Sequence, residues 1–168
     1  MIKCQISDEF ETSIDAYWAM FFSDEFNAAL WPHIKVVQKM LEFERQGEGE
    51  QLEIRRRHHL TPDREVPAML KRFVKGAIGY EEHNHFQRSK SQMTVKIIPG
   101  LMADRFECEG VFSVHEAGPN KVIRSYDATI KCSVPMVGGA VEKTINDSVK
   151  DSYEKATAFT RNWIRDHA

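Results

Sequence analysis

The segment VPMVGGAVEKTINDSVKDSYEKATAFTRNWI, residues 134–164, contains the clearest helical pattern in the chain. Apolar side chains recur every three or four positions from about Ala140 to Arg165, which is the spacing of one face of an α-helix. At about 1.5 Å per residue, such a helix is roughly 40 Å long. Gly138 and Gly139 lie just before it, and we expect them to let the start of the helix pack closely on a sheet. The sequence therefore predicts one long helix at the end of the chain.

One stripe of this helix contains unusually small residues. Ser148, Ser152 and Ala156 lie between Ile145 and Phe159, at positions where a filled core favours Leu or Phe. A gap at this stripe would leave space for a guest molecule. Close packing of small residues against a neighbouring element is the alternative, and the sequence leaves it open.

Upstream of the helix, the chain predicts one strand, two short helices and then six more strands. Residues 2–7 alternate between apolar and polar, the first short helix begins after Thr12 or Ser13, and Pro32 closes the second. From 35 to 134, apolar residues mostly alternate with a period of two, as in antiparallel strands joined by hairpins. The predicted strands lie near 36–46, 50–60, 79–90, 92–98, 105–116 and 121–134.

The segment VPAMLKRFVKG, residues 66–76, interrupts this alternation with apolar residues at helical spacing. We interpret it as a short helix or a lid-like loop inserted between two strands. Met69 and Phe73 are apolar residues in a connection that is ordinarily polar, as expected beside the entrance of a cavity. Packing of these residues as a small satellite of the core is the alternative.

This element order resembles the helix-grip fold of the START-like (SRPBCC, START/Bet v 1-like) superfamily, which includes polyketide cyclase/dehydrase and lipid-transport families. The segments 66–76 and 134–164 are similar to an uncharacterised bacterial branch of that superfamily. In that branch, V-P-x-x-G-G-x-x-E-K leads into the last helix and A-F-T-R-x-W ends it. The matching residues here are Val134, Pro135, Gly138, Gly139, Glu142, Lys143, Ala158, Phe159, Thr160, Arg161 and Trp163.

The resemblance covers essentially the whole chain and implies an α+β fold. It implies a curved antiparallel sheet of about seven strands wrapped round the long C-terminal helix, with two short helices after strand 1. It also implies a cavity for an apolar ligand between the sheet and that helix. No catalytic residues are carried over, because the branch has none assigned.

The composition narrows the class of protein. The 168 residues are 42% hydrophobic and 29% charged, which is ordinary for a globular protein, and we expect a single START-like domain over 1–168. A formal net charge of −2 offers no attraction to nucleic acid. Three cysteines without C-x-x-C spacing predict reduced thiols in a cytoplasmic protein.

Several predicted strands place polar side chains on a face that is otherwise apolar, because residues two apart share a face. A buried charge must pair with another group or meet a ligand's polar group or water. Solvation at strand ends, or a bulge that reverses the alternation, would explain the same pattern without a site. The candidate ligand-binding residues are Arg56, His58, Glu82, Asn84, Arg124 and Tyr126, joined by Ser148 and Ser152 on the helix and by Met69 and Phe73 on the inserted segment.

The histidine clusters and the basic run carry weaker signals. Two histidines at i, i+2 on a strand can share a metal, but neither His58-His59 nor the pair His83 and His85 has a predictable third ligand, so we expect no metal. No nucleotide-binding or hydrolase motif occurs, and no cofactor is expected. The basic run at 55–59 divides its charges between two strand faces, and a transient contact with acidic lipid remains open.

These patterns favour a protein that binds or transports a hydrophobic small molecule, such as a lipid, an isoprenoid or a polyketide-like compound. Arg56, Arg124 or Glu82 would orient the polar end of that molecule. One alternative is a cyclase or dehydratase, with His58 or Glu82 as general base and Arg124 or Tyr126 stabilising an enolate. Another is a protein-interaction module. Of these, the sequence favours a binding protein over an enzyme, and it identifies neither the ligand nor the oligomeric state.

Overall fold

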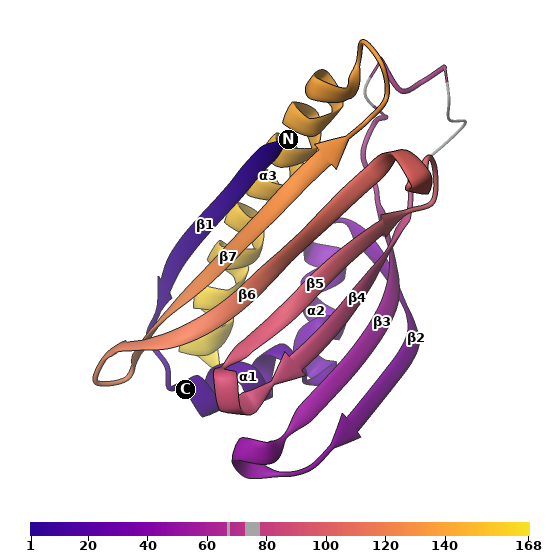
Figure 1. The fold of residues 1–168 in the computed structure, drawn as a ribbon. Coiled ribbons are helices and arrows are strands. Elements are labelled where there is room, and N and C mark those ends of the chain that lie inside the picture. The colour runs from indigo at the N-terminus through magenta and orange to yellow at the C-terminus, as the bar shows by residue number, and fades with distance from the viewer. Residues whose placement is uncertain (67, 73–77) are drawn as a thin grey trace.

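Seven antiparallel strands form one sheet that curves round a long helix (Figure 1). The computed structural model describes residues 1–66, 68–72 and 78–168. The strand order is β1-β7-β6-β5-β4-β3-β2, so each strand from β2 to β6 pairs with the next one along the chain, and β1 pairs with β7. The strands are β1 (Ile2–Phe10), β2 (Val36–Gln46), β3 (Glu53–Pro62), β4 (Tyr80–Gln87), β5 (Gln92–Pro99), β6 (Phe106–Gly118) and β7 (Lys121–Cys132).

Two short helices, α1 (Ile14–Phe21) and α2 (Asp24–His33), connect β1 to β2, and each has a serine N-cap. The hydroxyl oxygen of Ser13 accepts from the Ala16 N–H at 3.1 Å, and that of Ser23 accepts from the Phe26 N–H at 3.2 Å. Of the two predicted caps for α1, the structure therefore selects Ser13. Pro32 was expected to close α2 but lies inside its last turn, and the helix ends at His33, two residues later than the sequence predicts.

The long helix α3 (Gly138–Asp166) lies on the concave side of the sheet, against β7 and β1 (Figure 1). It begins two residues before the predicted start. A Cβ on Gly138 would overlap the backbone carbonyl of Cys132, so the expectation of close packing at the helix start is confirmed for this glycine. Gly139 has open space around its Cα and does not share that constraint.

The connection between β3 and β4 covers the start of α3. Its described residues 68–72 form turns, so the short helix predicted within 66–76 is absent from this part. Leu70 is buried with Cys132 and Val141, and Met69 packs against the same cluster. Phe73 lies outside the described residues.

The main core surrounds Trp18 of α1 on the inner face of the sheet. Its ring centroid lies 4.5 Å from that of Phe86 and 5.8 Å from that of Phe112. The Trp18 indole N–H donates to the Ser91 hydroxyl at 2.9 Å, and that hydroxyl donates to the Val114 carbonyl at 2.6 Å. These buried hydrogen bonds fix α1 against the sheet, because an indole N–H without a partner is costly inside a protein.

The structure also describes the cysteines and the apolar character of the helices. The three cysteines, Cys4, Cys108 and Cys132, are all buried and free. Among the described residues, no helix has both the length and the apolar character that a membrane crossing requires.

Candidate functional site

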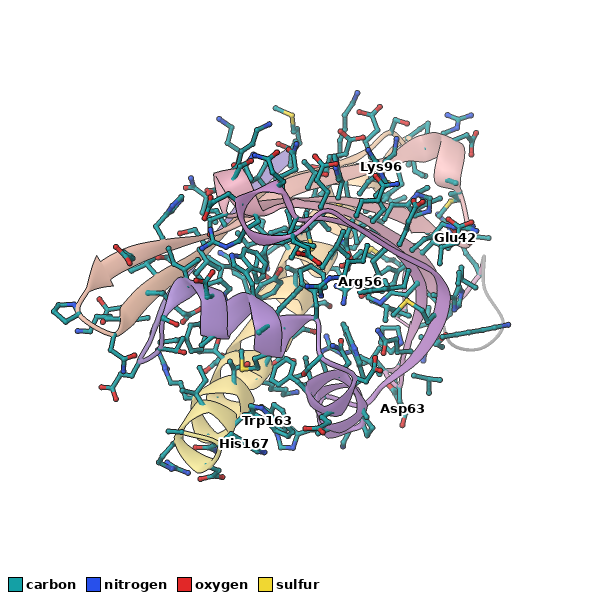
Figure 2. The ribbon with its side chains drawn as sticks, turned by 90° about the horizontal axis from the view of Figure 1, so that it is seen from below. Glu42, Arg56, Asp63, Lys96, Trp163 and His167 are labelled. Atoms are coloured by element: carbon teal, nitrogen blue, oxygen red, sulfur yellow. The ribbon has the colours of Figure 1, made fainter. Side chains whose placement is uncertain are left out.

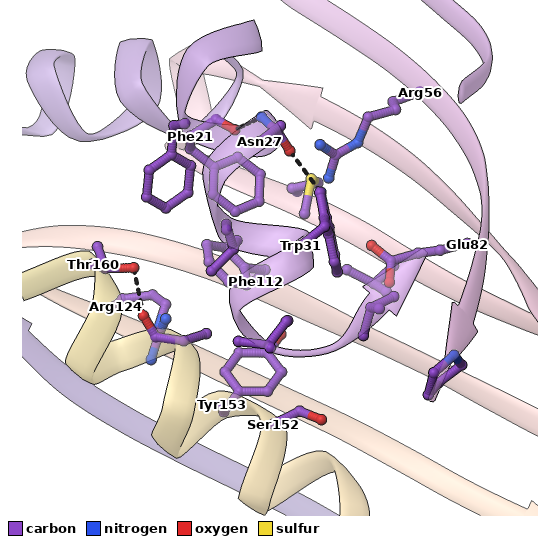
Figure 3. Close-up of a pocket in the computed structure, with 18 of the residues that line it drawn as sticks. Phe21, Asn27, Trp31, Arg56, Glu82, Phe112, Arg124, Ser152, Tyr153 and Thr160 are labelled. Atoms are coloured by element: carbon purple, nitrogen blue, oxygen red, sulfur yellow. Dashed lines mark hydrogen bonds between the residues drawn. The ribbon is translucent and has the colours of Figure 1, made fainter. Parts of the chain in front are cut away.

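Two adjoining cavities lie between the concave face of the sheet and α3. The first, here called the helix-side cavity, has a volume of about 140 Å³ and is bordered by α1, α2, the sheet and the second half of α3 (Figure 3). The second, the loop-side cavity, has a volume of about 300 Å³ and lies beside the first half of α3 and the β3–β4 connection. Six residues line both: Pro62, Tyr80, Glu82, Val95, Ser152 and Tyr153.

The loop-side cavity is mainly apolar and is as large as the smaller ligand pockets of proteins. Val95, Ile97 and Phe106 line it from the sheet, and Ile145 and Val149 line it from α3. Ser148 and Ser152 border the same space. Both serines therefore lie where the sequence expected a gap beside the long helix.

The inner faces of β3 and β4 bring together four of the candidate polar residues. On β3, Arg56 and His58 are buried on the same face as Ile54 and Leu60. The register places Arg56 opposite Asn84 of β4, and His58 opposite Glu82. The alternation read from the sequence thus placed all four side chains on the correct face of the sheet.

Asn84 connects Arg56 to Glu82. Its side-chain oxygen accepts from Arg56 Nε at 2.9 Å, and its amide nitrogen donates to Glu82 Oε1 at 3.0 Å. Asn84 does not itself line either cavity, whereas Arg56 lines the helix-side cavity and Glu82 lines both. Asn84 therefore acts from behind the lining and fixes the two charged side chains.

Arg56 and Glu82 both keep their charges in this environment. Burial lowers the pKa of the Arg56 guanidinium to about 10, with Glu82 acting in the opposite direction, so that the group remains cationic at neutral pH. Burial raises the pKa of the Glu82 carboxyl, but hydrogen bonds from His58 and Asn84 and the charge of Arg56 outweigh it. The net effect holds that pKa well below its usual range, and Glu82 is a carboxylate.

His58 lies behind the cavity lining. Its side chain is 0% exposed and lies edge-on to the Trp31 ring, with the ring centroids 5.7 Å apart. Nδ1 accepts from the Gln38 amide at 2.9 Å, which places the proton on Nε2, 3.4 Å from Glu82 Oε1. Burial lowers the pKa of His58 more than Glu82 raises it, so the imidazole is neutral at neutral pH.

Arg124 crosses from β7 to α3 at the other side of the helix-side cavity. Its Nη2 donates to Asp8 Oδ2 and to the Thr157 hydroxyl, both at 2.6 Å. Its guanidinium also lies over the Tyr153 ring, 5.0 Å from the centroid, and over the Phe10 ring at 5.1 Å. These contacts already neutralise Arg124, so its first role is to tie β1 and β7 to α3.

Tyr126 lines the loop-side cavity and stacks on Tyr153 of α3, with ring centroids 5.0 Å apart and planes at 10°. Burial raises the pKa of both phenols, which therefore remain protonated. Sequence reasoning did not select Tyr153 or Tyr80 as site residues, although both border the two cavities. The signal for Tyr153 was its position next to Ser152 on the stripe of small residues.

Arg64 was also missed, because it lies in the connection after β3 rather than on a strand. Its Nη2 donates to the Ser152 hydroxyl at 2.7 Å, its Nη1 donates to the Ser148 carbonyl at 3.3 Å, and Asp151 lies 3.4 Å away. Arg64 lines the loop-side cavity, whereas Met69 packs in the cluster around Leu70 and is not part of the lining. Arg64 therefore fastens the start of this connection to α3.

Two further histidines, His83 and His85, lie on the outer face of β4. His83 Nε2 is 2.9 Å from Glu81 Oε2, and His85 Nε2 is 3.6 Å from Glu53 Oε2. Among the described residues, no three histidine, cysteine or carboxylate side chains are close enough together to hold a metal ion. Figure 2 shows how Arg56, by contrast, points from β3 toward the interior of the molecule.

Solved structures with the same fold span almost the whole chain. A protein from Thermus thermophilus is 12% identical over 99% of both chains, with a TM-score of 0.63. A START superfamily protein from Mycobacterium smegmatis is 15% identical over 99% of both chains, with a TM-score of 0.58. Norcoclaurine synthase from Thalictrum flavum, in complex with dopamine and hydroxybenzaldehyde, is 14% identical over 99% of this chain and 88% of its own, with a TM-score of 0.59.

At these identities the likeness concerns the fold alone, and the curved seven-stranded sheet with its gripped helix is the START-like helix-grip fold. No curated protein matches the sequence. A family profile matches residues 5–164, and the chain belongs to that family, described as a protein of unknown function (DUF2505).

Proposed function

We propose that this protein binds a hydrophobic small molecule in the space between the sheet and α3. The observation that carries the proposal is the apolar loop-side cavity, which adjoins a second cavity at a short polar boundary formed by Tyr80, Glu82 and Ser152. A few polar groups within a mainly apolar pocket are typical of small-molecule sites. The space is half open and lies between the sheet and α3, which suits a small guest, whereas a protein partner would need an exposed apolar groove.

The affinity would come from burial of the guest's apolar surface, at roughly 25 cal/mol per Å². Val95, Ile97, Ile145 and Val149 would provide the contacts, and the polar groups would orient the guest. We propose that the whole chain acts as one such domain. The three free cysteines support a cytoplasmic location.

The test is to fill the cavity from α3. Ser152 borders both cavities, so Ser152→Trp places an indole in the proposed binding space. Ser152→Ala keeps the space and removes only the hydrogen bond from Arg64. Glu154→Trp adds the same ring to an exposed position two residues further along α3.

The binding assay is the fluorescence of a neutral apolar dye, N-phenyl-1-naphthylamine, and its displacement by long-chain lipids. We expect wild type, Ser152→Ala and Glu154→Trp to bind the dye and Ser152→Trp to lose it, with circular dichroism showing that each variant is folded. Equal dye binding by a folded Ser152→Trp variant would contradict the proposal.

The alternative of a cyclase or dehydratase has less support in this geometry. A direct general base must reach the substrate, but His58 is sealed behind the lining and donates toward Glu82. Glu82 does reach both cavities, yet its lowered pKa makes it a weak base near neutral pH. If Glu82→Gln abolished a turnover while leaving binding intact, this alternative would replace the binding proposal.

A further inference from the structure

Asn84 holds the side chains of Arg56 and Glu82 near each other, although the structure shows no salt bridge between these two described residues. They occupy diagonal positions on neighbouring strands, and Asn84 binds Nε of the arginine and Oε1 of the glutamate. Within the described ranges 1–66, 68–72 and 78–168, Arg56 forms no salt bridge. Figure 3 shows both side chains reaching into the helix-side cavity from the β3 and β4 side.

The groups that remain unpaired are complementary. Arg56 is only 4% exposed, and in the part of the chain that the structure describes its Nη1 and Nη2 atoms donate no hydrogen bond. They lie near the faces of Phe21 and Phe22, with Cζ 5.3 and 5.4 Å from the ring centroids, which offsets only part of the desolvation. Glu82 Oε2 likewise has no partner among the described residues, since both contacts of this carboxylate use Oε1.

The unused donors of the guanidinium and the unused acceptor of the carboxylate belong to two residues that line the same cavity, and a guest that bonds to both would satisfy them together. Asn84 holds Nε of Arg56 and Oε1 of Glu82, which leaves the other atoms of both groups free for such a guest. A guanidinium carries about five N–H donors, and Arg56 gives the one on Nε to Asn84, so the lining presents N–H donors of Nη1 and Nη2 and one carboxylate oxygen to the same guest.

The charges around this pair cancel. His58 is neutral, and the Arg124 charge across the cavity is compensated by Asp8 at 2.6 Å. With Arg56 and Glu82 both ionised, the lining of the helix-side cavity is close to neutral. A carboxylate guest would add an uncompensated negative charge beside Glu82, and an ammonium guest would add a positive charge beside Arg56.

We propose that the Arg56–Glu82 pair recognises a neutral polar group that both accepts and donates hydrogen bonds, such as a carboxamide or a hydroxyl next to a carbonyl. The guest's oxygen accepts from the Nη atoms of Arg56, and its N–H or O–H donates to Oε2 of Glu82. The inference rests on the proposed function and adds the chemical class of the guest: an apolar molecule with a neutral headgroup, rather than a free fatty acid.

The test compares four probes with one apolar chain and different headgroups: octanamide, methyl octanoate, octanoate and octylamine. Each displaces N-phenyl-1-naphthylamine at neutral pH, where octanoate is ionised. We expect octanamide to displace the dye at a concentration about tenfold lower than octanoate, a typical effect of avoiding one uncompensated buried charge. Methyl octanoate, which only accepts hydrogen bonds, should lie between them.

Two substitutions that remove opposite charges should change the order in which the probes displace the dye. Glu82→Gln leaves the charge of Arg56 uncompensated and should make octanoate the preferred probe. Arg56→Gln leaves the charge of Glu82 uncompensated and should favour octylamine, which is a cation at neutral pH. Glu81→Gln is the matched control, because it removes the same charge from the outer face of β4, where Glu81 contacts His83 and Arg57.

The outcomes separate the two proposals. No dye binding by folded wild-type protein would overturn the proposed function and this inference with it. Dye binding with octanoate preferred by the wild type, or with no displacement by any probe, would overturn this inference alone. The inference also fails if neither Glu82→Gln nor Arg56→Gln, each shown to be folded by circular dichroism, alters the order of the probes.

Discussion

Replacing Asn84 with alanine should destabilise the fold, because this side chain holds two buried charged groups. Asn84 is 5% exposed, and both of its side-chain hydrogen bonds go to ionised partners. A hydrogen bond to a charged group is worth about 1.5–3 kcal/mol. Two such bonds give an expected loss of about 3 kcal/mol at the lower end of that range, which applies because Glu82 keeps its contact with His58.

That loss is a large part of the stability of a typical domain, which is about 5–15 kcal/mol. For a chain of this length, it corresponds to a fall in Tm of roughly 6–12 °C. Urea unfolding followed by tryptophan fluorescence would measure it, and an unchanged m value would show that the folded and unfolded states are otherwise comparable.

Asn162→Ala provides the same substitution at an exposed position near the end of α3. It should change stability by no more than about 0.5 kcal/mol. A loss below about 1 kcal/mol for Asn84→Ala, with an unchanged m value, would refute the view that Asn84 compensates the burial of Arg56 and Glu82.

Two further predictions concern pH and packing. Burial lowers the pKa of His58 below 6.5, and the groups around Glu82 lower the pKa of its carboxyl below 4.5. Both residues therefore bind a proton more readily in the unfolded chain than in the folded one. Stability should therefore fall as the pH drops below 6.5 and fall again below 4.5, and His58→Gln should remove the first decrease in urea midpoints measured across that range. Gly110→Ala should lower the unfolding free energy by about 1–3 kcal/mol, because its Cβ would lie 2.7 Å from Ala128 Cβ and 2.8 Å from the Asp127 carbonyl oxygen. An unchanged urea midpoint would mean that β6 can shift away from β7 at little cost.

The alternation of side chains along strands was readable from the sequence. It placed Arg56, His58, Asn84 and Arg124 on the inner face, where the structure buries all four. The same reading predicted the element order, because periods of two and of about 3.6 depend on local backbone geometry. The helix-grip fold was implied by the resemblance of residues 66–76 and 134–164 to a START-like family. It also predicted the small residues of α3 that border the cavities.

Which inner-face residue reaches the cavities was decided by tertiary structure alone. Trp31 and Gln38 seal His58, while Arg56, two residues earlier on the same face of β3, stays open to the space beside α1. Arg124 pairs with Asp8, a residue 116 positions away in the sequence. Such outcomes depend on strand register and on where α2 and α3 lie over the sheet, and long-range contacts of this kind leave no local period in the sequence.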